Sequence, residues 1–178
     1  LLNALDAISK GAKIYTNANI QKVIRKKDNW EVFLNNGEIL YSKVIINASG
    51  PYSLHVLNNL IGIHSRKKIR HVQGNHIITE KLYKGEQAYI LQLNDKRIIF
   101  LIPYLDKYTL IGTTDHEVKS YDNPKITDIE KKYLISSVNK FIKNKITEDN
   151  IIWTYSGVRP LVEDLNENAS KITRDYSF

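Results

Sequence analysis

The stretch KRIIFLIPYLDKYTLIGTTD, residues 96–115, decides the fold of the second half of the chain. It contains two runs rich in Ile, Leu, Tyr and Thr, which are separated by a short break at residues 103–107. β-Branched and aromatic residues between turn residues favour strands. The stretch is therefore predicted to form two neighbouring strands, with Thr113, Thr114 and Asp115 at a strand end.

Other strand-like segments accompany this pair. Residues 69–79 and 87–93 have the same apolar and β-branched composition between turns. The run at 150–156, which opens the stretch IIWTYSGVRPLVED, is predicted to be a buried strand that stops at Gly157. Together these segments predict an antiparallel sheet.

The clearest helix signal in the chain begins at Thr127. Thr127 and Glu130 have the spacing of a capping box, in which each side chain bonds the backbone N–H of the other residue. The helical period beyond them predicts one apolar face. That face would contain Ile129, Tyr133, Val138, Phe141 and Ile142.

The first part of the chain has a different pattern. Residues 1–10 are predicted to form a short helix that ends at Gly11, and small antiparallel strands follow. The stretch KVIINASGPYS, residues 43–53, is a continuous apolar run that ends in a turn of small residues. Continuous apolarity is typical of a strand buried on both faces, as in the parallel sheet of an α/β domain. A helix is expected over residues 53–61.

The composition is that of an ordinary folded chain. With 42% hydrophobic and 25% charged residues, the 178 residues fit one globular domain, or two small ones that share a core. The absence of Cys excludes disulfides, thiol nucleophiles and thiolate metal sites. No apolar run approaches the roughly 20 residues of a membrane span, and the N-terminus lacks the features of a signal peptide. A soluble protein is therefore expected.

The net charge of +7 raises the question of an anionic partner such as nucleic acid. The basic residues are scattered, and runs such as RKK at 25–27 are short. Basic and aromatic side chains do not interleave at the spacing that a nucleic-acid groove requires. Nucleic-acid binding is not expected.

Two arginines are candidates for binding an anion. Arg159 follows Gly157, which permits close approach of another backbone or a ligand, and Pro160 restricts Arg159 to extended geometry. Arg174 lies in a second short strand-like segment, KITRDY. Two arginines held in this way could clamp a carboxylate or a phosphate through paired hydrogen bonds. The alternative is that both make structural or surface ion pairs with Glu163, Asp164 or Asp175.

His76, in QGNHIIT, is a candidate general base because it opens an apolar strand and histidine titrates near neutrality. The alternative for His76 is a structural histidine, which is also the role expected for His55, His64, His71 and His116. Asp115 is expected to be a cap or turn residue. No His and carboxylate pair has the spacing of metal ligands, so no metal is expected.

Five blocks of the sequence are similar to the flavin-dependent glycerol-3-phosphate dehydrogenases. In chain order they are INASGPY, QGNHII, YILQLNDKRIIFLIPYLDKYTLIGTTD, WTYSGVRPLVED and ITRDY. Unrelated proteins would not share several long blocks in the same order. The resemblance runs through nearly the whole chain.

The resemblance implies an α/β fold made of parts of two domains. Residues 1–64 would be the tail of a glutathione-reductase-type FAD-binding domain. Residues 65–178 would form a substrate domain with a largely antiparallel or mixed sheet, which returns toward the flavin at 151–178.

The same resemblance implies roles for single residues. Ala48, Ser49 and Gly50 would form the turn that passes near the adenosine and phosphates of FAD. Gly157 would let the chain approach the isoalloxazine ring.

The implied reaction oxidises sn-glycerol 3-phosphate to dihydroxyacetone phosphate, with hydride transfer to FAD. Arg159 and Arg174 would bind the phosphate and oxygen atoms of the substrate, and His76 would accept the hydroxyl proton or polarise the hydroxyl. The intact protein is implied to pass electrons to a membrane quinone, to be peripheral on the cytoplasmic face of the membrane, and often to be a homodimer.

The sequence departs from the family pattern at several positions. Gln73 and Asn75 stand where Lys and Ser are common, and Ser49 and Tyr52 stand where Thr and Trp are common. The chain also lacks a G-x-G-x-x-G loop for the pyrophosphate and has no Met. An internal fragment that is inactive alone and holds FAD poorly is therefore expected.

Two other functions stay open. The first is an amino-acid or sarcosine-type FAD oxidoreductase of the same superfamily, in which Arg159 binds a carboxylate. The second is a non-catalytic module that binds an anion and performs no redox step.

Overall fold

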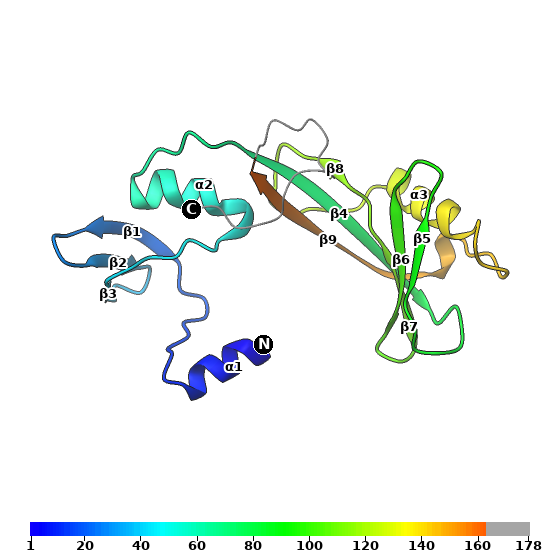
Figure 1. The fold of residues 1–178 in the computed structure, drawn as a ribbon, viewed down its shortest axis with the longest axis horizontal. Coiled ribbons are helices and arrows are strands. Elements are labelled where there is room, and N and C mark those ends of the chain that lie inside the picture. The colour runs from blue at the N-terminus through cyan, green and yellow to red at the C-terminus, as the bar shows by residue number, and fades with distance from the viewer. Residues whose placement is uncertain (163–178) are drawn as a thin grey trace. The chain divides into compact units, whose positions relative to one another are not determined.

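The computed structural model describes residues 1–162 of the 178-residue chain (Figure 1). The chain divides into two compact units, one of Leu1–Arg66 and one that begins at Lys67. Both contain antiparallel sheet and helix, so the mixed α/β class predicted from the sequence is confirmed. No helix within residues 1–162 is long and apolar enough to cross a membrane.

A small antiparallel sheet organises the first unit. The helix α1 (Leu2–Ser9) precedes it and ends, as predicted, just before Gly11, whose φ of 92° lies in the left-handed region. The strands pair in the order β1 (Ile20–Arg25), β2 (Trp30–Leu34) and β3 (Ile39–Ser42). The buried core of the unit consists of Val23, Val32 and Leu34.

A helical segment follows at residues 50–61, where a helix was expected. It begins with the 3₁₀ turn η1 (Gly50–Tyr52), continues as α2 (Ser53–His55), and ends as the π-helical η2 (Val56–Ile61). Gly62 follows it with a φ of 78°, which is the left-handed geometry of a helix end.

The apolar run before this segment does not form the buried parallel strand predicted for it. Residues 43–49 form neither helix nor strand, and Val44 and Ile46 are 69% and 86% exposed. A strand needs a neighbour that completes its backbone hydrogen bonds. Because none of the strands within residues 1–162 pairs with this run, the prediction is wrong for the part of the chain described.

A six-stranded antiparallel sheet forms the second unit (Figure 1). Its central strand β4 (Ile69–Glu80) pairs on one side with β9 (Ile151–Val162) and on the other with β7 (Tyr108–Gly112). The sheet continues from β7 through β6 (Ile98–Tyr104) to β5 (Tyr89–Gln92), and the short β8 (His116–Glu117) also pairs with β4. The pairing of β6 with β7 confirms the predicted hairpin.

The last strand does not stop at Gly157. After the short η3 (Glu148–Asn150), β9 runs on to Val162, and Gly157 pairs with Gly74 of β4. Ile152 and Trp153 are 52% and 60% exposed, so this strand is not buried as predicted. The reason is the length of β4, whose twelve residues provide hydrogen-bonding partners along the whole of β9.

The helix α3 (Asp128–Val138) begins with the predicted capping box of Thr127 and Glu130. The predicted apolar face is right in part: Val138 is buried, and Tyr133 and Ile142 pack against the same core, but Ile129 and Phe141 are 81% and 50% exposed. The buried side chains of α3 are Leu134, Ile135, Ser137 and Val138. The helix ends at Val138, so the helical period does not extend to the later apolar residues.

The two faces of β4 have different surroundings, because successive residues of a strand point to opposite faces. On one face, which we call the helix face, Ile77 packs with Leu134 and Val138 of α3. The opposite face carries Gly74 and His76, and residues paired across an antiparallel ladder share a face. Through its pairing with β9, this second face also carries Gly157 and Arg159, and we call it the arginine face.

Candidate functional site

Arg159 lies on the arginine face, where β9 pairs it with Val72 of β4. Its guanidinium lies over Gly74, because a Cβ atom at Gly74 would be 2.9 Å from both Nη1 and Nη2 of Arg159 and 2.7 Å from Oγ1 of Thr113. Such distances are shorter than real Cβ contacts. Gly74 therefore provides the space that the guanidinium occupies.

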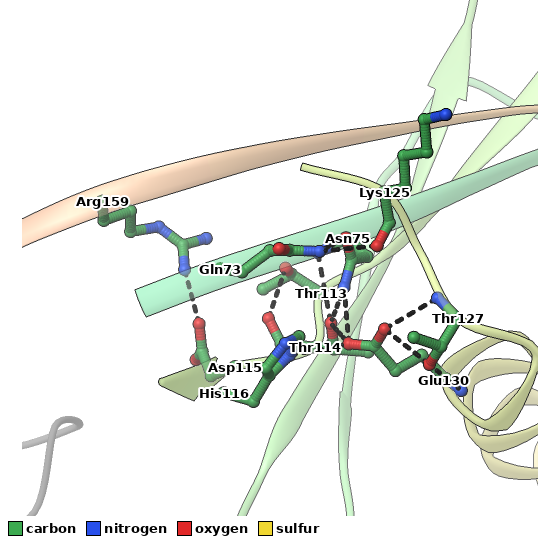
Figure 2. Close-up of polar contacts among 10 residues, drawn as sticks. All are labelled: Gln73, Asn75, Thr113, Thr114, Asp115, His116, Lys125, Thr127, Glu130 and Arg159. Atoms are coloured by element: carbon green, nitrogen blue, oxygen red, sulfur yellow. Dashed lines mark hydrogen bonds and ion pairs between the residues drawn. The ribbon is translucent and has the colours of Figure 1, made fainter. Parts of the chain in front are cut away.

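The partner of Arg159 is Asp115, whose Oδ1 lies 2.5 Å from Nη1 (Figure 2). The two side chains are 35% and 43% exposed, so the ion pair can be reached from solvent. Asp115 was expected to be a cap or turn residue, and its pairing with Arg159 was missed. The carboxylates weighed as alternatives, Glu163, Asp164 and Asp175, lie outside the described residues, as does Arg174.

His76 lies farther along the same face of β4. Its ring stacks on that of Tyr155, with centroids 4.7 Å apart and an interplanar angle of 9°. A Cβ atom at Gly112 of β7 would be 2.2 Å from Cδ2 of His76, so the imidazole occupies the space that any other residue at 112 would fill. Its Nδ1 is buried and has no hydrogen-bond partner within residues 1–162.

Burial lowers the pKa of His76 below its ordinary value of 6.5, and the positive charge of Arg159 lowers it further. The carboxylate of Asp115 acts in the opposite direction, but the net direction is down. The imidazole is therefore neutral at neutral pH, which is the form that can accept a proton.

Gly157 leaves open space between Tyr155 and Arg159, which are its neighbours on the arginine face. A Cβ atom built at Gly157 meets nothing within 4 Å. On the side of the sheet to which a side chain at 157 would point, the described chain therefore leaves the space beside Gly157 open. The structure thus brings three predicted site residues, His76, Gly157 and Arg159, onto one face of the sheet.

A polar network occupies the helix face of the same strand (Figure 2). Nε2 of Gln73 donates to Oδ1 of Asn75 at 2.8 Å and to the carbonyl of Lys125 at 2.9 Å. Nδ2 of Asn75 donates to Oγ1 of Thr114 at 2.9 Å and to Oε1 of Glu130 at 2.5 Å. Gln73 and Asn75 are thus buried in a network on the face opposite Arg159.

The carboxylate of Glu130 is the acceptor at the centre of this network. Burial raises its pKa, but hydrogen bonds from the N–H and hydroxyl of Thr127 and the hydroxyl of Thr114, together with His116, outweigh burial and lower the pKa overall. Nδ1 of His116 lies 2.8 Å from Oε1 of Glu130. Glu130 is therefore ionised at neutral pH.

The sequence profile of the family described as FAD dependent oxidoreductase matches residues 1–172. The chain belongs to this family of FAD-dependent oxidoreductases. Within residues 1–162, no three His, Asp or Glu side chains are grouped to hold a metal ion.

Several relatives match the whole chain or nearly so, and they include the following two. A glycerol-3-phosphate dehydrogenase of Pseudomonas aeruginosa is 40% identical over 184 residues, which cover 100% of this chain and 36% of that protein. A D-erythritol 1-phosphate dehydrogenase of Brucella abortus is 37% identical, covering 99% of this chain and 36% of that protein. The chain thus spans about a third of the length of these relatives.

A solved structure shares the fold. The glycerol-3-phosphate dehydrogenase of Bacillus halodurans complexed with FAD matches with a TM-score of 0.77 and 24% identity, covering 89% of this chain and 34% of that one. The fold of the described residues is therefore that of an FAD-dependent oxidoreductase, as predicted.

The turn predicted to pass near FAD lies in the first unit. Oδ1 of Asn47 accepts hydrogen bonds from the hydroxyl of Ser49 at 2.6 Å and from its N–H at 3.3 Å. Gly50 has a φ of 57°, which favours glycine, and begins the helical segment. Ala48, Ser49 and Gly50 thus form a turn of small residues at the start of a helical segment, a geometry that suits the approach of an anionic group.

The lowered pKa of His76 predicts a specific dependence of stability on pH. Below pH 6.5 the unfolded chain binds a proton at His76 that the folded chain does not bind, so the free energy of unfolding falls as the pH drops from 6.5 toward the lowered pKa. Above pH 6.5 the contribution is constant. Urea unfolding at about pH 7.5 and about pH 5.5 should show that acidification lowers the free energy of unfolding less in His76→Gln than in the wild type.

His64→Gln removes one histidine at an exposed position and is the matched control. An equal loss of stability on acidification in the wild type and His76→Gln would contradict the expected shift.

Proposed function

We propose that this chain forms the substrate-binding part of a flavoprotein that oxidises sn-glycerol 3-phosphate to dihydroxyacetone phosphate. The observation that supports it most is the arginine face, where a neutral histidine and a partly exposed arginine flank open space above Gly157. The 40% identity to a glycerol-3-phosphate dehydrogenase supports the choice of substrate.

In this proposal each side chain has a separate task. The guanidinium of Arg159 binds phosphate or hydroxyl oxygens of the substrate through paired hydrogen bonds, and we assign the same task to Arg174 from its position in ITRDY. The imidazole of His76 accepts the proton of the substrate hydroxyl. The stack on Tyr155 holds this ring in one orientation.

The flavin is assigned to the open side of the arginine face. Gly157 presents no side chain there and nothing within 4 Å would obstruct one, so its backbone can approach a planar ring. When bound, FAD supplies the acceptor for the hydride that leaves C2 of the substrate. Ala48, Ser49 and Gly50 would hold the nucleotide end of the cofactor.

We further propose the two-domain organisation that the resemblance implies. Residues 1–64 belong to the FAD-binding domain, and residues 65–178 belong to the substrate domain. Because the chain spans about 36% of its relatives, we propose that it acts within a longer protein and is inactive alone. That protein would pass electrons to quinone, lie on the cytoplasmic face of the membrane, and form homodimers.

Anaerobic visible spectroscopy of the complete protein with FAD tests this function. Glycerol 3-phosphate should bleach the flavin absorbance, whereas glycerol should not, because it lacks the phosphate that the arginines bind. Bleaching by sarcosine instead would identify a carboxylate substrate. A flavin that no substrate reduces would favour a binding module.

A second polyol phosphate is a specific alternative to glycerol 3-phosphate as the substrate. The chain is 37% identical to a D-erythritol 1-phosphate dehydrogenase, so D-erythritol 1-phosphate belongs in the same assay. The ratio of kcat/KM for the two phosphates decides between them.

A further inference from the structure

Five hydrogen-bond donors surround the carboxylate of Glu130. Oε1 accepts from Nδ2 of Asn75 at 2.5 Å and from Oγ1 of Thr114 at 3.0 Å, and it pairs with Nδ1 of His116 at 2.8 Å. Oε2 accepts from the N–H of Thr127 at 2.9 Å and from its hydroxyl at 2.8 Å. Only an ionised carboxylate can accept from all of these groups, since an amide would direct its own N–H at a donor.

Two of these donors come from the residues on either side of Asp115. Oε1 of Glu130 holds the side chain of Thr114 and that of His116 at the same time. The residue between them, Asp115, forms the ion pair with Arg159. Figure 2 shows Glu130 at one end of this arrangement and Arg159 at the other.

The contacts of the three residues that lead into β8 explain why this matters for Asp115. Thr114 and His116 contact Glu130, whereas Asp115 between them contacts Arg159, which is the alternation of an extended chain. Fixing the two flanking side chains fixes the direction of the Cα–Cβ bond of Asp115. The ladder of β8 with β4 begins at His116, but Thr114 is also tied to β4, because its N–H donates to the carbonyl of Asn75 at 3.4 Å and its Oγ1 accepts from the N–H of Asn75 at 3.2 Å. Glu130 adds the contacts to the side chains of Thr114 and His116.

We propose that Glu130 is a positioning residue for Arg159 and acts through Asp115. Glu130 fixes the Thr114–His116 segment, and Asp115 then holds the guanidinium over Gly74 in one orientation. A preorganised guanidinium loses less conformational entropy when it binds an anion. This inference rests on the proposed function, in which Arg159 binds the substrate.

The test compares three variants of the complete protein. Glu130→Gln places an amide among five donors, and Asp115→Asn removes the charge that pairs with Arg159. The matched control is Asp128→Asn, which removes one negative charge from the same first turn of α3, at a side chain that is 77% exposed and pairs with Lys131. The control separates the positioning effect from a change in helix charge.

The first measurement is the side-chain Nε–H resonance of Arg159, which Arg159→Lys assigns by its loss. We expect this resonance to shift and broaden in Glu130→Gln and Asp115→Asn and to stay unchanged in Asp128→Asn. An unchanged resonance in Glu130→Gln would overturn the proposal, whatever the substrate of the protein is.

The second measurement is the steady-state kinetics with glycerol 3-phosphate. KM should rise about tenfold in Glu130→Gln with kcat changed less than about threefold, because substrate binding and not the chemical step is affected. In an Arg159→Lys background the same change should alter KM by less than about twofold, since coupled residues are not additive. A full tenfold effect in that background would show that Glu130 acts by another route and would refute the proposal.

The two measurements separate this inference from the proposed function. A shifted Arg159 resonance with no reaction of glycerol 3-phosphate supports the positioning role and removes the proposed substrate. A protein that oxidises glycerol 3-phosphate while the resonance is unchanged keeps the function and removes the positioning role.

Discussion

Replacing Arg159 by alanine is expected to lower kcat/KM for glycerol 3-phosphate by about 10²- to 10³-fold. Truncating one member of a buried hydrogen-bonded charge pair costs about 2–5 kcal/mol, and about 3–4 kcal/mol for a guanidinium that the bound substrate covers corresponds to about 10²- to 10³-fold at 1.4 kcal/mol per tenfold. The loss has two sources, because the substrate loses a guanidinium and Asp115 loses the charge it pairs with. Steady-state kinetics of the complete protein, with FAD bound, measure the effect.

Arg97→Ala is the matched control for Arg159→Ala. Arg97 also pairs with an aspartate, Asp95 at 2.7 Å, and its side chain is 54% exposed. It is not assigned to the arginine face, so kcat/KM should stay within about twofold of the wild type. A value for Arg159→Ala equally close to the wild type would mean that the pair with Asp115 is structural only.

Replacing Gly112 by alanine is expected to destabilise the protein by about 1–3 kcal/mol, the usual cost of overfilling a packed site. The new methyl group would lie 2.2 Å from Cδ2 and 2.7 Å from Nε2 of His76, so the imidazole must move. That movement breaks the stack on Tyr155 and also displaces the proposed base. Urea unfolding gives the stability, and kcat should fall in the same variant.

Gly157→Ala is the control for stability, because it makes the same change on the same face of the sheet. Its methyl group meets nothing within 4 Å, so stability should change by less than about 1 kcal/mol. The two variants therefore differ in what surrounds the added atom. Equal unfolding midpoints for Gly112→Ala and the wild type would disprove the steric argument.

Short-range signals in the sequence predicted most of the second unit. The capping box of Thr127 and Glu130 involves residues three apart, and the hairpin of β6 and β7 has its turn between its own strands. Such features depend on local sequence and recur wherever that sequence occurs. The similarity of five whole sequence blocks predicted the family, and the match over residues 1–172 confirms that prediction.

The errors occurred where long-range pairing decides the outcome. The apolar run at 43–48 has the composition of a buried strand, yet no strand within residues 1–162 pairs with it. The buried face of α3 depends on which side packs against Ile77 of β4, and the sequence pattern correctly selected Val138 but missed Leu134 and Ile135. Burial is a property of neighbours, so a segment does not determine it alone.

By itself, the sequence determined the classes of element, the family, and the candidates His76, Gly157 and Arg159. Only the tertiary structure decided that Asp115, 44 residues before Arg159, is its partner, and that Gly74 and Gly112 make room for the candidate side chains Arg159 and His76. The physical reason is the register of β4 with β9 and β7, which places residues distant in sequence opposite one another. Register is set by hydrogen bonding and packing along whole strands, and no single motif contains that information.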